Sequence, residues 1–477
     1  MSEIPTQLFI NGEFRSSTQG KPAGLINPAT EEIIAEIAGA SAEDVAAAIE
    51  SAHEAYRRGW RDLTPGKRTD VLFNIARLLR ENMERIAQLE SQSIGKPISD
   101  ARDEAALGAR VFEYYAGAIT KFTGQTIPVA RGGFDFTLRQ PMGVVAAIVP
   151  WNFPFPIACW KVAPALAAGN SVVLKPASLS PLTALLLGQI ARQAGLPPGV
   201  LQVLPGSGQE TGDVLVTHPL IRKVSFTGST SVGSRIMELA SRGLKRVSLE
   251  LGGKSPNIVF ADADVDRAAM ESPMSVFANT GQDCCARSRV FVERRVFDRF
   301  VDSFTAATRQ LRVGNPVQDA TQLGPLVSAG QRRVVEDFIS EARKGGRRIA
   351  AGGDRPFPRG YYLNPAVVLE VEPSDRVWRE EVFGPVVCIR PFDDEAKMIE
   401  EVNDSPYGLS GSLWTNDLRR ALRVARQVES GVLSINSNSS VHVEAPFGGF
   451  KQSGLGRDLG MAAMEGYTEL KNVYVGE

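Results

Sequence analysis

Histidine and cysteine are scarce in this sequence, with three and four copies among 477 residues. The histidines stand far apart and no C-x-x-C pair occurs, so a zinc site is not predicted. The cysteines are also too few and too scattered for a disulfide scaffold in a chain of this length. Reduced thiols are the simplest interpretation, and they favour a cytoplasmic location. The four cysteines are Cys159, Cys284, Cys285 and Cys388.

An excess of one charge is also lacking, because the formal net charge is −1 and no long run of one sign occurs. A nucleic-acid partner is therefore not expected. No stretch has the apolar length of a membrane span, and the segment MSEIPTQLFINGEF lacks the basic start and apolar core of a signal peptide. Hydrophobic residues at 43% and charged residues at 22% are ordinary for a globular protein, which favours small-molecule chemistry.

Helical patterns dominate the first third of the chain, over 41–57, 66–93 and 100–117. The first begins at Ser41, a plausible N-cap with Asp44 three residues further on. The middle of the chain then alternates short β-branched runs with helical patterns, which is typical of βαβ units and a parallel sheet. The expected strands are 144–149, 171–174, 200–204, 223–226 and 247–249, and the expected helices are 158–168, 181–194 and 209–217.

A second α/β series begins near Asn257 and predicts a second α/β domain. It comprises a helix at 264–278 and strands at 288–292, 366–369, 386–390, 411–414 and 432–435. The segments 122–140 and 467–475 look extended and outside both domains. They predict either strands that pair with a partner subunit or an edge strand within one domain.

Glycine-rich segments offer three candidate phosphate loops. The Gly-Gly-Lys-Ser run at 252–255 lacks the leading glycine of a P-loop, because Ser248 stands in its place. The run at 206–212 is one residue too long for a dinucleotide fingerprint and favours a turn and helix entry. The best candidate is Gly228-Ser229, which follows a strand and opens a helix whose free backbone N–H groups suit a pyrophosphate. The same pattern is also common helix-capping chemistry.

Four short motifs occur together: PWNFP at 150–154, LELGGKSPN at 249–257, GQDCCA at 281–286 and EEVFGP at 380–385. With them the chain strongly resembles the aldehyde dehydrogenase superfamily, from INGEF at 10–14 to PFGGFKQSGLGRDLG at 446–460. The resemblance implies two Rossmann-type α/β domains and a small β oligomerisation arm, in a homodimer or homotetramer. It places the dinucleotide-binding domain at 1–121 and 142–252, the catalytic domain at 253–450, and bridging segments at 122–141 and 451–477.

The resemblance also assigns a mechanism, the hydrolytic oxidation of an aldehyde to a carboxylic acid. Cys284 matches the nucleophile, and the pKa of a thiol can be lowered at a suitable site. Asn152 matches the oxyanion-hole residue, acting with the Cys284 backbone N–H. Glu250 matches the base that activates water, and burial would suit it by raising its pKa. Alone, Asn152 would be a turn residue and Glu250 a structural glutamate.

The cofactor implied is NAD or NADP. Trp151 and Ser229 resemble the pyrophosphate and loop contacts, Lys175 the lysine on the adenosine ribose, and Glu381 and Phe383 the residues at the nicotinamide ribose and ring. Many relatives that prefer NAD carry a glutamate where this chain has Ser178. A serine does not repel the extra phosphate of NADP, so we expect NADP to be accepted. Ser178 is otherwise a simple helix cap.

The substrate clues conflict. Phe153, Trp160 and Phe447 align with aromatic tunnel positions, which suit apolar or cationic aldehydes. The Gly-Gln-Asp-Cys motif at 281–284 resembles the motif of aminoaldehyde-oxidising relatives. Ser178 and Arg287 are instead compatible with a semialdehyde that carries a carboxylate. Arg287 is also explained as a structural or surface arginine. Two other classes stay open, a cofactor-independent cysteine hydrolase and a catalytically silent member of the fold.

Overall fold

The computed structural model describes residues 4–439 and 441–476. Helix α1 (Ala42–Ala55) begins as predicted, with a capping box between Ser41 and Asp44. The predicted helix over 66–93 is instead two helices, α2 (Pro65–Glu81) and α3 (Met83–Ile94). The break falls at Asn82, where the backbone leaves the helical conformation (φ −103°, ψ 9°) and the side-chain amide joins the backbone N–H in donating to the Leu78 carbonyl, at 2.8 and 3.1 Å. Helix α4 (Ile98–Ala118) follows.

The first large sheet has the strand order β2-β1-β9-β8-β7-β10-β11-β21. The five strands predicted in the middle of the chain form its parallel centre: β7 (Val144–Ile148), β8 (Ser171–Lys175), β9 (Leu201–Val203), β10 (Ile221–Thr227) and β11 (Arg246–Glu250). Antiparallel strands that the patterns did not reveal extend it at both edges: β1 (Leu8–Ile10), β2 (Glu13–Arg15) and β21 (Gly454–Leu455). A separate hairpin joins β3 (Ala23–Ile26) to β4 (Ile33–Ile37).

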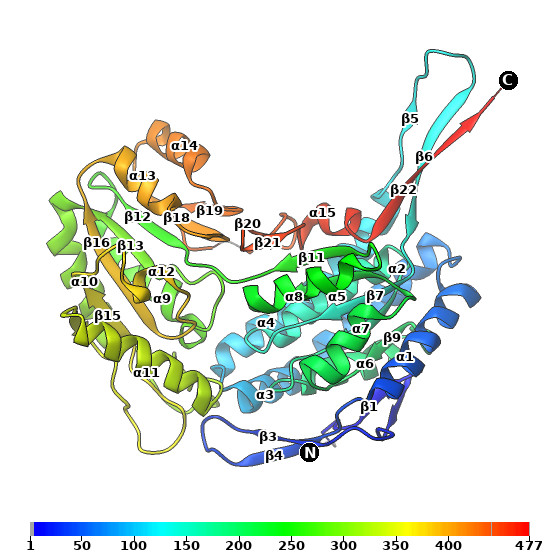
Figure 1. Ribbon diagram of the computed structural model, residues 1–477, viewed down its shortest axis with the longest axis horizontal. Coiled ribbons are helices and arrows are strands. Elements are labelled where there is room, and N and C mark those ends of the chain that lie inside the picture. Colours follow the sequence, from blue (N-terminus) through cyan, green and yellow to red (C-terminus); the bar gives the residue numbers. More distant parts are fainter. Residues whose placement is uncertain (1–3, 440, 477) are drawn as a thin grey trace.

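Helices cover both faces of this sheet (Figure 1). Alternate residues of β7 enter two different cores, because successive side chains of a strand point to opposite faces. Val145 and Ala147 pack with α2, α4, α5 (Pro154–Ala167) and α6 (Leu182–Gln193). Val144 and Ala146 pack instead with α1, α7 (Val214–Thr217) and α8 (Thr230–Ser241). The arrangement is doubly wound, so the carboxyl ends of its parallel strands share one edge.

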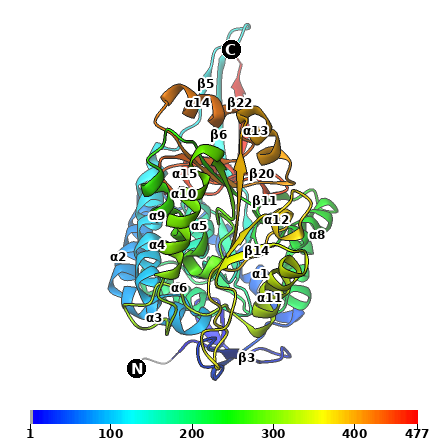
Figure 2. The ribbon, with the colours of Figure 1, turned by 90° about the vertical axis from the view of Figure 1, so that its left-hand side faces the viewer.

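A second α/β sheet has the order β14-β15-β16-β13-β12-β18-β19, with only β14 antiparallel. Its strands are β12 (Pro256–Val259), β13 (Arg289–Glu293), β14 (Arg348–Ala351), β15 (Ala366–Leu369), β16 (Val386–Phe392), β18 (Ser410–Trp414) and β19 (Val432–Ile435). Strands β12 and β14 were not predicted. Figure 2 shows α9 (Val265–Phe277) and α10 (Phe297–Arg309) on one side of it. The other side carries α11 (Ala329–Lys344), α12 (Arg376–Arg379), α13 (Glu395–Asn403) and α14 (Leu418–Gln427).

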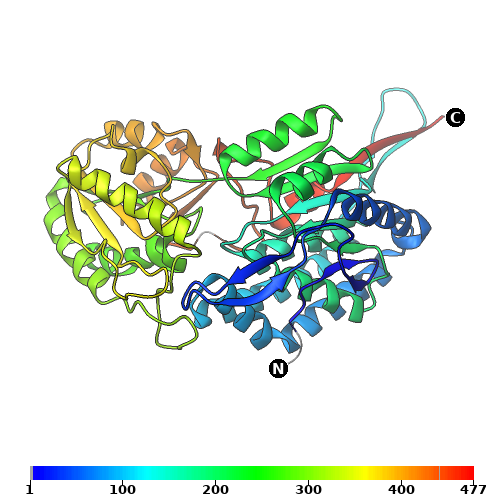
Figure 3. The ribbon, with the colours of Figure 1, turned by 60° about the horizontal axis from the view of Figure 1, so that its bottom comes forward.

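The two extended segments meet in a three-stranded sheet of their own, which we call the arm. Strand β22 (Thr468–Val475) pairs antiparallel with β6 (Phe134–Pro141) along its whole length, and β5 (Thr126–Ile127) pairs with β6. The arm projects from the body with the C-terminus near its tip (Figures 1 and 3). The predicted alternative of an edge strand within a large domain is therefore wrong. The remaining elements are α15 (Gly460–Glu465) and the pair β17 (Tyr407–Gly408) with β20 (Phe450–Lys451).

Within the part of the chain that the structure describes, no helix is both long enough and apolar enough to cross a membrane.

Candidate active site

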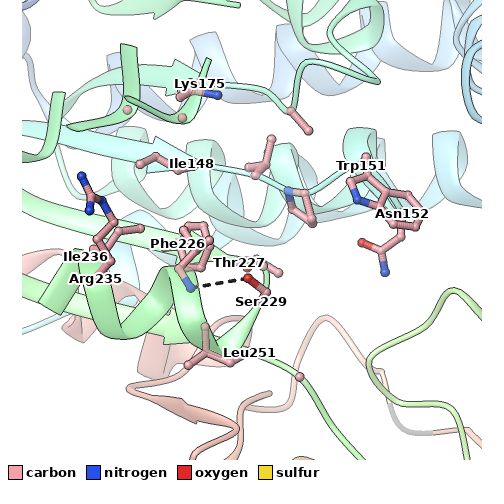
Figure 4. A pocket seen from close by; sticks show the side chains of 18 of the residues that line it. Ile148, Trp151, Asn152, Lys175, Phe226, Thr227, Ser229, Arg235, Ile236 and Leu251 are labelled. Atoms are coloured by element: carbon pink, nitrogen blue, oxygen red, sulfur yellow. Dashed lines mark hydrogen bonds between the residues drawn. The ribbon is translucent and has the colours of Figure 1, made fainter. Parts of the chain in front are cut away.

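A pocket with a cavity volume of about 450 Å³ lies at the carboxyl edge of the first sheet. This is where doubly wound sheets bind ligands, and the volume is in the range of cofactor and substrate sites. Figure 4 shows side chains from the ends of β7, β8 and β10 and from the start of α8 turned toward one space. Of the residues singled out in the sequence, the lining includes Trp151, Asn152, Lys175, Gly228, Ser229, Cys284, Glu381 and Phe383.

The turn before α8 is built as an anion-binding helix start. The Ser229 hydroxyl accepts from the Val232 backbone N–H at 3.4 Å and so caps the helix (Figure 4). Gly228 donates its own N–H to the Glu250 carbonyl at 3.0 Å. A Cβ at Gly228 would come within 2.4 Å of the Phe226 ring, so the close turn requires glycine. The first turn of α8 therefore presents uncapped N–H groups and a positive dipole end to the pocket.

Glycines allow three of the four motifs to touch. A Cβ on Gly253 would lie 2.3 Å from the Cys284 carbonyl oxygen, and one on Gly252 would lie 2.3 Å from a Glu381 carboxylate oxygen. A Cβ on Gly281 would lie 2.1 Å from the Gly384 carbonyl oxygen. At Gly253 and Gly281 these distances exclude a side chain unless the backbone shifts, whereas at Gly252 the Glu381 side chain would have to move. The glycines thus seat the 281–286 loop against both the LELGGK strand end and the EEVFGP segment.

Asn152 of the PWNFP motif joins the same loop. The Asn152 side-chain amide donates to the Gln282 backbone carbonyl at 2.9 Å, and the Asn152 backbone carbonyl accepts from the Asn279 side-chain amide at 2.9 Å. An amide nitrogen carries two N–H groups, and Gln282 occupies one of them. Gln282 is itself fixed, because its side-chain oxygen accepts from the Val327 N–H at 2.9 Å. Asn279 and Gln282 are positioning residues that the motif comparison did not single out.

Cys284 is partly exposed and lines the pocket, whereas Cys159, Cys285 and Cys388 are buried. The environment does not lower its pKa. Hydrogen bonding with Cys285, burial, and the nearby Asp283 and Glu381 carboxylates hold the pKa of the Cys284 thiol well above its ordinary value. This environment therefore favours the neutral thiol over a preformed thiolate.

Glu250 ends β11 and is buried. Among the described residues neither of its carboxylate oxygens has a hydrogen-bond partner. Burial, reinforced by Asp458, raises the pKa of Glu250 well above its ordinary value, against smaller opposing effects of Lys161 and Arg457. A Cβ on Gly448 would lie 2.6 Å from one of its oxygens, so the carboxylate faces the 446–460 segment. Its side chain is not among those lining the dinucleotide-shaped pocket.

A buried ion pair lies near Glu250 and was missed in the sequence. Lys161 on α5 contacts Asp458 at 2.9 Å and donates to the Ser225 hydroxyl at 3.1 Å, and both charged side chains are buried. Every residue of α5 is buried, and Lys161 is its only charged one. A single lysine inside an otherwise apolar helix was the signal, because such a charge needs a partner.

The far end of the pocket holds Lys175, at the end of β8. It is buried, its ammonium group donates to the Pro176 carbonyl at 3.1 Å, and burial lowers its pKa to about 8. Ser178 is exposed and donates its hydroxyl to the Gly206 carbonyl at 3.0 Å. Ser178 does not line the pocket, although Gly208 and Gly212 of the neighbouring turn do. Arg235 also lines this end and pairs with Asp213.

Glu381 and Phe383 close the opposite side. Glu381 accepts the Gly253 N–H at 3.1 Å, and burial raises its pKa to about 7. Phe383 has a left-handed backbone (φ 54°), an uncommon conformation for a bulky residue and one that recurs at ligand sites. Its ring meets Trp151 edge-on at 5.3 Å, and Gln331 supports it by donating to its carbonyl at 2.8 Å.

The three aromatic residues expected around the aldehyde lie outside this pocket's lining. Trp160 and Phe447 meet edge to face at 5.5 Å, and the Trp160 indole N–H has no partner among the described residues. Phe153 is partly exposed, with the Lys96 ammonium group 4.2 Å from its ring centre.

Arg287 is not a surface residue. It is buried and donates to the Ser412 hydroxyl at 3.1 Å and to the Cys285 carbonyl at 2.8 Å. It therefore supports the backbone just after Cys284.

The fold and the site together define a class of enzyme: an α/β protein whose dinucleotide-type pocket ends at a cysteine, beside an asparagine amide and a buried glutamate. Residues 14–473 match the model of the aldehyde dehydrogenase family. The chain belongs to that family and is an aldehyde dehydrogenase.

Individual relatives resemble it over nearly the whole length. A putative aldehyde dehydrogenase, DhaS, from Bacillus subtilis is 41% identical over 98% of this chain and 95% of its own. Betaine aldehyde dehydrogenase 1 from Oryza sativa is 42% identical over 99% and 96%. The solved NAD⁺ complex of an aldehyde dehydrogenase from Bacillus cereus is 41% identical, covers 99% of this chain and 96% of its own, and superposes with a TM-score of 0.97.

Proposed function

We propose that this enzyme oxidises an aldehyde to a carboxylic acid with NAD or NADP, through a covalent thioester on Cys284. One observation carries the proposal: the Cys284 thiol lies in the same pocket as the α8 N-terminus and the Glu381 carboxylate. A reacting carbonyl at that thiol is thus next to the place where a dinucleotide would end.

The pocket's residues fit such a cofactor. The start of α8 at Gly228-Ser229 suits its pyrophosphate, and Trp151 packs nearby. Lys175 suits the adenosine ribose, while Glu381 can accept hydrogen bonds from the other ribose. A dinucleotide held there would supply the acceptor for the hydride that the first adduct must lose to become a thioester.

The chain's own residues carry the remaining steps. The Cys284 thiol gives its proton to solvent water, its sulfur bonds to the aldehyde carbon, and the carbonyl π bond breaks to leave an oxyanion. The second N–H of the Asn152 amide and the Cys284 backbone N–H stabilise that oxygen; one such donor is worth about 3–4 kcal/mol of barrier. After oxidation, Glu250 takes a proton from water, which attacks the thioester and releases the acid from the Cys284 sulfur.

Ser178 itself places no carboxylate against the extra phosphate of NADP, and this end of the pocket carries two cations, Lys175 and the Arg235 that pairs with Asp213. We therefore include NADP among the accepted cofactors. The proposed assembly is a homodimer or homotetramer built through the arm.

The test is to mix the enzyme with a panel of aldehydes and NAD or NADP and to follow the reduced cofactor. Cys284→Ser should nearly abolish oxidation, because the serine hydroxyl is a far weaker nucleophile. Near-normal turnover in that variant rules out the assignment. Ester cleavage without any aldehyde oxidation would support the hydrolase alternative, and inertness toward both would support a silent member of the fold.

A further inference from the structure

The residue before the nucleophile places a carboxylate beside the reacting sulfur. One carboxylate oxygen of Asp283 and the sulfur atoms of Cys284 and Cys285 all lie within 4.8 Å of one another. The Cys285 backbone N–H donates to the Asp283 carboxylate at 2.8 Å and fixes its orientation. A catalytic thiol next to a fixed carboxylate is an electrostatic conflict, because an anion disfavours the thiolate. The mechanism proposed above makes no use of Asp283.

Cys284 lines the dinucleotide-shaped pocket, and Asp283 does not. Among the cations that act on the Asp283 carboxylate is Lys96, whose ammonium group lies against the Phe153 ring. Asp283 is nevertheless partly exposed. Because this partly exposed carboxylate lies beside the Cys284 sulfur, a ligand held at that sulfur can reach it.

The cations around Asp283 are buried and already bonded to other groups, so the Asp283 carboxylate remains available to a ligand. Lys96 is buried and is paired with Glu104, and Arg287 is buried and bonded to Ser412 and Cys285. The Glu381 and Asp283 carboxylates repel each other across the 281–286 loop. Because Arg287 faces the interior, it is not available to bind a substrate carboxylate.

We propose that Asp283 determines specificity by binding a cationic group carried by a short aldehyde, so that the arriving cation relieves the repulsion between Asp283 and the Cys284 thiolate. This inference rests on the proposed function. It favours a cationic aldehyde over an anionic semialdehyde. It also links recognition to reactivity, because the thiol ionises more readily once the substrate's charge has neutralised its neighbour.

The raised pKa of the Cys284 thiol in the absence of a ligand agrees with this proposal. Both Asp283 and Glu381 help to hold the pKa of Cys284 high, along with Cys285 and burial. Burial in turn raises the pKa of Asp283, while its bond from Cys285 and the charge of Arg287 oppose that rise. An ammonium group placed at Asp283 acts on the same balance in the direction that favours both anions.

The substrate test compares two aldehydes of equal shape, trimethylammonioacetaldehyde and its uncharged isostere tert-butylacetaldehyde, with succinic semialdehyde as the anionic member. We expect the wild type to prefer the cation in kcat/KM. Asp283→Asn should reduce that preference about tenfold or more, as expected for the loss of a hydrogen-bonded charge interaction, and should improve use of the semialdehyde. Asp283→Glu, which retains the charge, should keep part of the preference. Melting temperature and cofactor binding check that the variants fold.

A second readout is the pH dependence of Cys284 alkylation by iodoacetamide, followed by mass spectrometry at this cysteine. Tetramethylammonium should lower the midpoint in the wild type and leave it unchanged in Asp283→Asn, whose midpoint should already be lower. The inference is overturned if kcat/KM is equal for the two isosteres, or if tetramethylammonium does not change the alkylation midpoint of the wild type. Either result would leave aldehyde oxidation itself intact. Absence of oxidation with all three aldehydes and both cofactors would instead count against the proposed function.

Discussion

At the scale of the residue, burial of carboxylates controls the proposed chemistry. Glu250 must be ionised to take a proton from water, and burial raises its pKa well above the ordinary value. The rate of thioester hydrolysis should therefore rise with pH as Glu250 loses its proton, at a higher pH than for an exposed glutamate. In an ordinary surface position the same side chain would be fully ionised and a weaker base.

We expect Glu250→Gln to retain a rapid first turnover of reduced cofactor and to lose about 10²–10⁴-fold in the steady state, because only water activation is impaired. Rapid-mixing absorbance separates the two phases. The pH-dependent limb described above should also disappear from the steady-state rate of the variant. Unchanged steady-state turnover would remove Glu250 from the mechanism.

Ser178 allows a cofactor prediction. Ser178→Glu places a carboxylate near Lys175, and it should lower kcat/KM with NADP by about tenfold or more while NAD is retained. Ser178→Gln is the matched control, since it adds similar bulk without charge. Both cofactors are titrated at constant ionic strength. A loss of equal size with NAD and NADP would show that Ser178 does not discriminate between them.

At the scale of the element, helix α5 holds the buried Lys161 close to Glu250, where Lys161 pairs with Asp458. Lys161→Met leaves Asp458 buried without its cation, which should lower the free energy of unfolding by about 3–5 kcal/mol in urea denaturation. Adding Asp458→Asn should recover part of that loss, because no unpaired charge then remains buried. Simple addition of the two single effects would argue that the pair is not coupled.

The same pair should shift the pH limb assigned to Glu250 in opposite directions. Lys161 lowers the pKa of Glu250 and Asp458 raises it. Lys161→Met should therefore move the limb to higher pH and Asp458→Asn to lower pH, as measured in steady-state rate profiles. Shifts in the same direction would show a general loss of structure instead.

Most central elements were predictable, and the errors share physical causes. Strands β7, β8, β10, β13 and β16 were found because buried parallel strands are continuous apolar runs. The edge strands β1 and β2 are three residues each, too short for a pattern to develop. Strand β12 begins at Pro256 directly after a glycine-rich turn, which hid it. The interruption at Asn82 is a single residue with non-helical backbone angles, and no glycine or proline marks it in the sequence.

At the scale of the whole molecule, the arm offers an apolar surface. Directly opposed residues of paired strands share a face, so Phe134 with Val475 and Phe136 with Val473 lie on the same side as Leu138. Phe134, Leu138 and Val475 are exposed in the single chain. Exposed apolar side chains clustered on a projecting sheet are typical of a surface that another subunit covers.

We expect Leu138→Lys to shift the protein toward smaller assemblies in light scattering coupled to size-exclusion chromatography, because it places a charge in the proposed interface. Leu470→Lys is the matched control. Leu470 is also exposed but pairs with Arg139, on the opposite face of the same strands. Equal effects of both substitutions would contradict an interface on this face, and no effect of Leu138→Lys would exclude Leu138 from it.

The sequence by itself determined the local conformations and the chemical groups available. Apolar periodicity fixed the parallel strands, Ser41 and Ser229 fixed helix starts, and the glycines of the motifs fixed turns that no other residue tolerates. These depend on neighbours only a few positions away, so they can be read along the chain.

Only the tertiary structure decided what those groups experience. Asn152, Glu250, Cys284 and Glu381 are separated by tens to hundreds of residues, and packing alone brings three of them to one pocket. The raised pKa of Cys284 and the buried partner of Lys161 were likewise invisible in the linear pattern. Burial and electrostatic proximity are properties of the folded interior, because they arise between segments that meet only once the chain has folded.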